Sequence, residues 1–205
     1  MYIPAAHAWT DLASILACCR AHPFATVIAV DDGEPEAQHL PLLTDHAEGR
    51  FVLYGHAAVG DPVWRAARAM AVFHGPHAYI SAAWYEEPNT VPTWNYLAVH
   101  LTGSLHVIDD PETSAALFAR LAASVGDADA HVWQRRLDAP TTAKLTAMIR
   151  WFRIDVDHVQ AKAKLSQHHS PERRRRVIAR LMASPEPAAP AVGEAMAETL
   201  ASGPP

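Results

Sequence analysis

Long apolar runs, cysteines spaced for disulfides and positive charge near the N-terminus are all lacking in this sequence. No stretch approaches the roughly 20 apolar residues that a membrane-spanning helix needs, so we expect no membrane partner. The two cysteines, Cys18 and Cys19, are adjacent and cannot form a disulfide framework. The first Lys or Arg is Arg20, which argues against a signal peptide. These absences together predict a protein of the reducing cytoplasm.

Recognisable metal-binding and nucleophile motifs are also missing, although the chain has 13 histidines. The histidines show no HExxH pattern, and neither a Cys-x-x-Cys pair nor an acidic loop accompanies them. No Gly-x-Ser-x-Gly elbow occurs, and neither Ser81 nor Ser166 has an identifiable base partner. We therefore expect no metal site and assign no catalytic residue, which leaves open whether the chain is an enzyme.

Charge is unevenly distributed along this chain, whose net charge is −5. Residues 158–182 hold seven of the 17 Lys and Arg but one of the 22 Asp and Glu. They include the consecutive residues Arg173, Arg174, Arg175 and Arg176. On a helix such a run spreads around the axis rather than forming one basic stripe. Runs of this kind are usually solvated or paired with acids; contact with DNA phosphates is the alternative, although we find no helix-turn-helix pattern.

Alternation of apolar and polar residues predicts several strands. The clearest runs from Leu97 to Val107, with a bend or bulge at Gly103. A second covers residues 152–165, where the apolar register shifts by one residue near Asp157 and His158. Many short strands with intervening helices favour a mainly β fold with helical additions, such as a barrel. We expect one domain over residues 1–183 and a disordered, Ala- and Pro-rich tail over residues 184–205.

Aromatic side chains are concentrated in residues 73–96, which read FHGPHAYISAAWYEEPNTVPTWNY. Rings offer an apolar surface on which a flat ligand can stack, and neighbouring polar tips can bind its rim. The same density is typical of the edge of a packed core, and composition alone favours that second interpretation.

An ordered set of short motifs resembles the PaiB family, described as FMN-binding negative transcriptional regulators. In chain order the motifs are MYIP at 1–4, HPFA at 22–25, QHLP at 38–41, LYGHA at 53–57, DPVW at 61–64, VPTWNY at 91–96 and KLSQ at 164–167. The resemblance implies an FMN-binding split β-barrel. It also implies a homodimer with the flavin at the subunit interface.

The resemblance further implies a cofactor site for FMN. The strand at His39, Leu40 and Pro41 would run along the isoalloxazine ring. The turn that begins with Gly55, His56 and Ala57 would approach the phosphate.

Two later motifs would complete this site. Trp94 and Tyr96 would cover the ring. Lys164, Ser166 and Gln167 would supply a cation and a hydroxyl to the phosphate, or bridge to the partner subunit. A flavin mononucleotide needs such a surface for its ring and such groups for its phosphate.

Two positions in the turn depart from the family pattern. Val59 stands where the family carries a cation, and Asp61 stands where it carries a neutral amide. A carboxylate would repel a phosphate placed beside it. Three functions therefore stay open: an FMN-binding regulator, a flavin-dependent or haem-degrading oxidoreductase on the same fold, and a barrel without cofactor that serves as a binding module.

Overall fold

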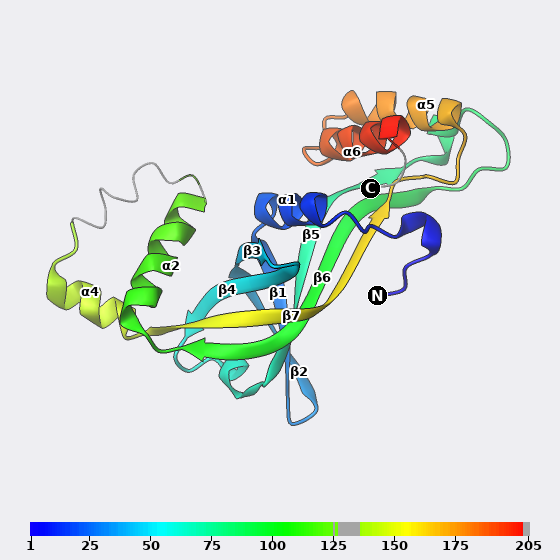
Figure 1. Cartoon of the computed structure of the whole chain (residues 1–205). Helices are drawn as coiled ribbons and strands as arrows, with labels where there is room; N and C mark the ends of the chain where they lie inside the picture. The colour runs from blue at the N-terminus through cyan, green and yellow to red at the C-terminus, as the bar shows by residue number, and fades with distance from the viewer. Residues whose placement is uncertain (125, 127–135, 203–205) are drawn as a thin grey trace. The chain divides into compact units, whose positions relative to one another are not determined.

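The computed structural model describes residues 1–124, 126 and 136–202, which are grouped into two compact units. The first unit comprises Met1–Cys18, His74–Val99 and the chain from Gln160 onward. The second comprises Cys19–Phe73 and His100–Val159. The expectation of one domain over residues 1–183 stays a prediction. The three longest strands, drawn in Figure 1, each contribute residues to both units.

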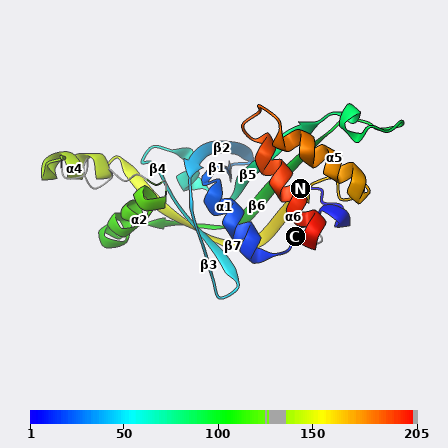
Figure 2. The same cartoon turned by 90° about the horizontal axis from the view of Figure 1, so that it is seen from above.

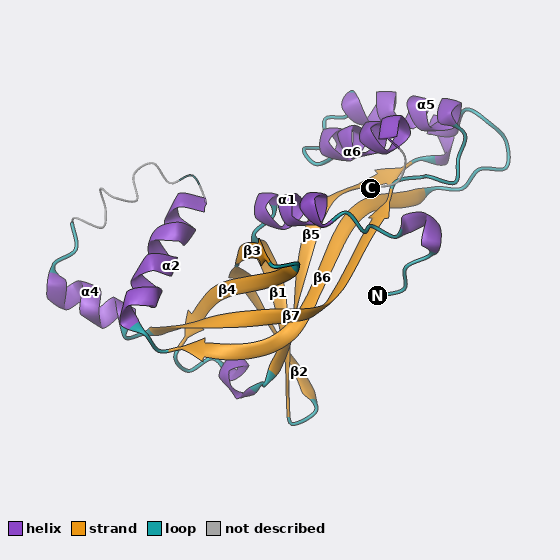
Figure 3. Ribbon diagram, viewed as in Figure 1, coloured by secondary structure: helices purple, strands orange, loops and turns teal. Residues whose placement is uncertain are grey.

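The second unit is built around a β-barrel. The strands are β1 (Phe24–Asp31), β2 (Glu34–Pro41), β3 (Leu43–Ala47), β4 (Arg50–Ala58), β5 (Arg68–Ile80), β6 (Thr93–Ile108) and β7 (Ile149–Lys164), drawn in orange in Figure 3. Their order in the sheet is β2-β1-β5-β6-β7-β4-β3. β2 and β3 are the two ends of this order, yet Leu42 alone separates them in the chain. Because β2 pairs with β1 while β3 pairs with β4, this continuous segment closes the sheet into a barrel.

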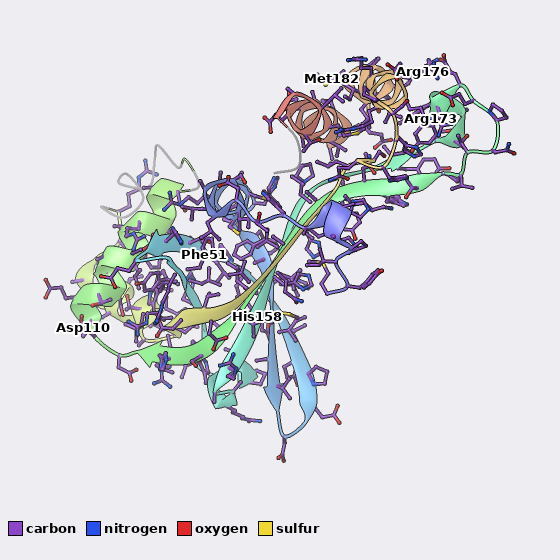
Figure 4. All side chains as sticks on the ribbon, turned by 45° about the vertical axis from the view of Figure 1, so that its right-hand side comes forward. Phe51, Asp110, His158, Arg173, Arg176 and Met182 are labelled. Carbon is purple, nitrogen blue, oxygen red and sulfur yellow. The ribbon has the colours of Figure 1, made fainter. Side chains whose placement is uncertain are left out.

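Large apolar side chains fill the barrel of the second unit. Phe51, Leu53, Phe152 and Ile154 are fully buried, and Figure 4 labels Phe51. They come from β4 and β7, which pair with each other. Leu53 lies opposite Ile154, and Gly55 lies opposite Phe152. The alternation of β4, buried at every second residue, therefore defines the inside of the barrel.

Helices flank the barrel strands within the second unit. Leu117 of α2 (Pro111–Ser124) packs in one apolar cluster with Leu43 and Trp151. The described part of this unit also contains two short elements, η2 (Pro62–Arg65) and α4 (Ala139–Thr146).

The first unit combines strand ends with two packed helices. α5 (Pro171–Met182) and α6 (Ala189–Ser202) lie side by side in Figures 1 and 2. The 3-10 helix η3 (Ala82–Tyr85) also contacts α5. The N-terminal part of the chain adds η1 (Ala5–His7) and the start of α1 (Leu12–Ala21).

The expectation of a disordered tail over residues 184–205 is wrong where the structure describes that segment. Ala189, Val192 and Met196 recur at helical spacing, and each is buried. They give α6 an apolar face, which packs on the buried Val177 and Leu181 side of α5. The abundance of alanine and proline hid this period in the sequence.

The predicted shift of register in β7 is confirmed. Phe152, Ile154 and Val156 are buried in the first half of the strand, whereas Ala161 and Ala163 are buried in the second half. The outward side of β7 therefore changes from odd-numbered to even-numbered residues. This shift points the side chains of Gln160, Lys162 and Lys164 away from the buried side of the first unit.

Candidate functional site

Aromatic rings are exposed on the outward side of two neighbouring strand ends in the first unit. β5 contributes His77 and Tyr79, and β6 contributes Trp94 and Tyr96. The Trp94 ring centroid lies 6.2 Å from that of His77 and 6.1 Å from that of Tyr79. Trp94 is 53% exposed and Tyr79 is 49% exposed. A cluster of exposed rings on a sheet marks a candidate binding surface.

Two lysines extend this surface along β7. Lys162 Nζ lies 5.5 Å from the centroid of the Tyr96 ring and donates a hydrogen bond of 3.1 Å to the carbonyl oxygen of Tyr2. Lys164, two residues further along the strand, donates to Thr93 Oγ1. We call the set His77, Tyr79, Trp94, Tyr96, Lys162 and Lys164 the aromatic face.

The aromatic face is locally basic on a chain whose net charge is −5. The strand residues of this unit, 74–80, 93–99 and 160–164, include no Asp or Glu. Rings supply a flat apolar surface and lysines attract anions, so the chemistry suits a planar ligand that carries a negative group. An isoalloxazine ring with a phosphate-bearing side chain has this chemistry.

A buried polar pair lies behind the aromatic face. Asn95 is 0% exposed and Ser166 is 1% exposed. The Asn95 amide donates to Ser166 Oγ at 2.9 Å, and the Ser166 hydroxyl donates to Asn95 Oδ1 at 3.2 Å. Because its hydroxyl is turned inward, we assign Ser166 to the support of the face rather than to ligand contact.

Gln167 also has intramolecular partners. Its Oε1 accepts a hydrogen bond of 2.8 Å from the backbone N–H of Leu165, and it lies 3.0 Å from His7 Nδ1. Its Nε2 donates to the carbonyl oxygen of Ala163. Gln167 therefore shapes the turn that follows β7. Of the predicted residues in this unit, Trp94, Tyr96 and Lys164 form part of the aromatic face.

The other predicted site residues belong to the second unit. His39 on β2 is exposed, and its Nδ1 lies 3.2 Å from Thr26 Oγ1. Leu40 and Pro41 follow it and are half-buried. The structure thus brings the predicted residues together in two groups, one in each unit, and a role for His39, Leu40 and Pro41 along a flavin ring stays a prediction.

The predicted turn after β4 begins with packed residues. The His56 ring centroid lies 4.8 Å from that of Trp151 and 6.1 Å from that of Phe118. Its Nδ1 is buried without a hydrogen-bond partner among the described residues, and burial lowers the pKa of this imidazole. Ala57 is buried. Gly55 is enclosed by Leu42 and Phe152 inside the barrel.

Asp61, which departs from the family pattern, has a structural role. Its carboxylate accepts a hydrogen bond of 2.9 Å from the backbone N–H of Val63 and thereby caps η2. Pro62 follows at the first helical position, where a missing N–H costs nothing. The Asp61 carboxylate therefore binds the backbone of its own turn. Val59 is 48% exposed.

The arginine run of α5 is largely engaged within the first unit. Arg173 and Arg176 both bind the Glu87 carboxylate (Figure 4 labels both arginines), and the two guanidinium groups hold the pKa of this carboxyl below its ordinary value. Arg174 is buried and donates to the carbonyl oxygen of Met196 at 2.9 Å and to Thr199. Arg175 has a side chain that is 65% exposed, 3.7 Å from Glu172.

Histidine, cysteine and acidic side chains could bind a metal or supply a nucleophile in the part of the chain that the structure describes. Within it, no group of three or more His, Cys, Asp or Glu is arranged to hold a metal ion. Burial raises the pKa of the Cys18 thiol to about 11, so this cysteine is a poor nucleophile at neutral pH.

A membrane-spanning helix is likewise not found among the described residues, because none of their helices is both long enough and apolar enough.

Sequence reasoning missed four residues of this site: His77, Tyr79, Asn95 and Lys162. His77 and Tyr79 alternate with the buried Ala78 and Ile80, so their period of two was the available signal. The role of Asn95 had no such signal, because its partner Ser166 lies 71 residues away in the sequence.

Comparisons with known proteins give a family and a relative for most of this chain. Residues 1–158 match the family described as "Putative FMN-binding domain". The chain is also 34% identical, over 204 residues and 98% of each chain, to the "Protease synthase and sporulation protein PAI 2" of Bacillus subtilis strain 168.

Solved structures resemble the fold at lower identity. The flavocytochrome Anf3 of Azotobacter vinelandii has a TM-score of 0.56 and 18% identity over 75% of this chain and 67% of that one. The FAD and heme binding protein of Mycobacterium smegmatis has a TM-score of 0.56 and 22% identity over 76% of this chain and 72% of that one. At these identities the likeness shows the fold, a mainly β split barrel with helical additions.

Proposed function

Because the chain belongs to the PaiB family of FMN-binding split-barrel proteins, we propose that it binds FMN and acts as a negative transcriptional regulator. The regulatory role is supported by the family alone. The cofactor has support from the family and from one structural observation, the aromatic face of the first unit. The aromatic rings of this face match the isoalloxazine ring of FMN. Its lysines match the phosphate, because the neighbouring strand residues include no carboxylate.

Within this proposal each part of the aromatic face has a task. Trp94 and Tyr96 cover the isoalloxazine ring, and Tyr79 extends the same surface. Lys164 carries the positive charge for the phosphate, and Lys162 adds a second. When bound, FMN supplies redox chemistry or a ligand-sensitive state. The residues of the chain supply binding and orientation.

We further propose that the protein is a cytoplasmic homodimer. Trp94 and Tyr79 leave about half of their surface exposed, and the nearby Val91 is 75% exposed. A second copy that covered these side chains would bury them, and a flavin held at such an interface would be enclosed on both sides. Sedimentation velocity with and without FMN measures this state. A monomer under both conditions overturns the dimer.

Titration of the dialysed protein with FMN tests the cofactor, followed by the change in flavin absorbance and fluorescence. Stacking on an aromatic side chain is worth about 1–3 kcal/mol, so we expect Trp94→Ala to weaken binding by roughly tenfold or more. We expect Lys164→Ala to weaken binding as well, and its effect to shrink at high salt because the contact is ionic. Leu145→Ala, which removes a 48% exposed side chain on α4, is the matched control and should bind as the wild type does.

Two outcomes would overturn parts of this proposal. If no saturable binding occurs, the protein is a split barrel that has lost its cofactor. If the wild type binds and Trp94→Ala binds equally well, the flavin does not use the aromatic face. The strand at His39 and the turn at His56 then become the place to test by substitution.

DNA is the proposed partner for the regulatory role. In α5, a single arginine of the run supports a direct contact with DNA. Arg173, Arg174 and Arg176 are engaged within the unit, which leaves Arg175 as the member of the run most open to a phosphate. Salt-dependent DNA binding that weakens in Arg175→Gln would support a direct contact through α5. Binding that is absent, or unchanged by this substitution, overturns that contact.

A further inference from the structure

We propose that Asn95 is a positioning residue, which fixes the aromatic face through its buried pair with Ser166. The inference rests on the proposed FMN function, because FMN is the ligand. It goes beyond that function by naming the contact that holds the aromatic face in place. Neither Asn95 nor Ser166 is expected to touch the flavin.

The pair links β6, one of the three strands that carry the face, to the turn that follows β7, another of them. Asn95 lies in β6 between Trp94 and Tyr96, and Ser166 follows β7 two residues after Lys164. Hydrogen bonds of 2.9 Å and 3.2 Å run in opposite directions between the amide and the hydroxyl. The amide nitrogen also lies 3.3 Å from Met196 Sδ of α6, so the pair is enclosed from behind.

The inward direction of Asn95 determines the direction of its neighbours. Successive side chains of a strand point to opposite faces, so an amide held on the buried side places Trp94 and Tyr96 on the outward side. A buried amide that lost its partner would have to reach water or pay for desolvation. Either response would twist this end of β6 and move both rings.

The same pair stabilises an unfavourable backbone conformation beside Lys164. Ser166 has a φ of 60°, in the left-handed region that non-glycine residues seldom adopt. Such a conformation persists only where surrounding contacts enforce it. The contacts here are the bonds of Asn95 to the Ser166 hydroxyl and of the Gln167 side chain to Leu165 and Ala163. The direction in which the chain leaves Lys164 depends on them.

A purely structural role would make Asn95 one more core contact, whose loss lowers stability and nothing else. The positioning role differs because it predicts a local change at Trp94 in the absence of any ligand. The test therefore needs a signal from Trp94 itself. Incorporation of 5-fluorotryptophan gives one fluorine resonance for each of the six tryptophans, and Trp94→Phe assigns the one that belongs to Trp94.

Three variants probe the pair, with one control. Asn95→Leu replaces the amide with a larger apolar side chain of the same branching, Ser166→Ala removes the hydroxyl, and the double variant removes both. Val177→Ala shortens a fully buried side chain of α5 and serves as the control for lost stability. Each variant is measured for the Trp94 fluorine resonance without FMN, for FMN affinity and for thermal unfolding.

We expect each single variant to shift or broaden the Trp94 resonance and to weaken FMN binding by roughly tenfold. We expect the double variant to weaken binding about as much as either single one, because both changes break the same contact. Exchange of the two residues, Asn95→Ser with Ser166→Asn, rebuilds the pair in reverse, and asparagine tolerates the left-handed conformation. This exchange should recover part of the affinity and of the wild-type resonance.

The results separate this inference from the proposed function. A wild type that binds no FMN ends the cofactor proposal, while the Trp94 resonance still tests the pair. A Trp94 resonance that stays unchanged in both single variants overturns the positioning role. A resonance that moves as much in Val177→Ala overturns it too, because general loss of stability would then explain the change.

Discussion

Gly55 shows how a residue within a motif can serve the fold. The resemblance places it at the start of a phosphate-binding turn, which stays a prediction, and the structure places its backbone inside the barrel. A Cβ at this position would lie 2.5 Å from Leu42 Cδ2 and 2.7 Å from Phe152 Cζ. These distances are far below van der Waals contact, so the absence of a side chain lets β4 lie against the core at this point.

We predict that Gly55→Ala lowers the free energy of unfolding by about 1–3 kcal/mol, because the added methyl group overpacks the barrel. Gly60→Ala is the matched control. A Cβ at Gly60 meets nothing within 4 Å, and we expect a change of at most about 0.5 kcal/mol. Urea denaturation of both variants measures the difference. Equal stability of the two would contradict the packing argument.

Asp61 marks the limit of sequence reasoning at this scale. Its identity and charge were visible, and they predicted repulsion of a nearby phosphate. The sequence did not reveal where the carboxylate points. The structure turns it back onto the backbone N–H of Val63, which is the contact that an Asp before a Pro favours at a helix start. The sequence gives the residue type and its charge, but the direction of the Asp61 carboxylate could not be predicted from it.

Among the elements, those with a local period were predictable. The strand at residues 97–107 and the register shift near Asp157 both follow from alternation along a short segment, and the structure contains both within β6 and β7. Gly103 lies in an unbroken β6, where a Cβ would come within 2.0 Å of the carbonyl oxygen of Asp155. Close approach of two backbones accounts for this glycine, and the bend or bulge expected there stays a prediction.

α6 was missed because composition was given more weight than spacing. Its apolar residues are small or isolated, so the segment resembles a linker in composition. The helix is stabilised by α5, and an isolated helix of this length is marginal in water. Its helical spacing of buried residues and its contact with α5 distinguish it from a disordered tail.

Met196→Ala tests whether α6 is packed in solution. The side chain is 0% exposed, and truncation of a buried methionine typically costs about 2–5 kcal/mol. We expect a loss of unfolding free energy in that range by urea denaturation. Glu194→Gln, on the exposed side of the same helix, should leave stability unchanged. A disordered tail would make both substitutions neutral, which is the result that would contradict the structure.

For the molecule as a whole, the closure of the barrel lay beyond sequence reasoning. It depends on the pairing of β2 with β1 and of β3 with β4, on either side of Leu42. Local periodicity identifies strands but not their partners, and contacts between distant segments leave no pattern in a single sequence. Family resemblance therefore supplied the split-barrel form, whereas the strands and a mainly β fold followed from the residues.

The described histidines and carboxyls with shifted pKa values act in the same direction on acidification. Burial lowers the pKa of His22, His56, His168 and His169 from 6.5. Below pH 6.5 the unfolded chain therefore binds protons that the folded chain resists, and stability falls. Hydrogen bonds and arginines lower the pKa of carboxyls such as Asp11 and Asp157 from 3.8, so a further loss follows at lower pH.

Alkaline solution affects stability through the buried Cys18 thiol. Burial raises its pKa from 9.0 to about 11, so above pH 9 the unfolded chain loses a proton that the folded chain keeps, and stability again falls. We therefore predict a plateau of maximal stability between about pH 6.5 and pH 9.

Urea denaturation from pH 5 to pH 10.5 measures both limbs of this curve. Cys18→Ala should flatten the alkaline limb and leave the acid limb in place, because it removes only the thiol. His168→Asn should reduce the acid limb alone. The His168 pKa is lowered first by burial and then by repulsion from His7 and Lys164, so its removal deletes one proton-binding site of the unfolded chain. Stability that rises as the pH falls from 7 to 5 would contradict the sign of all four histidine shifts.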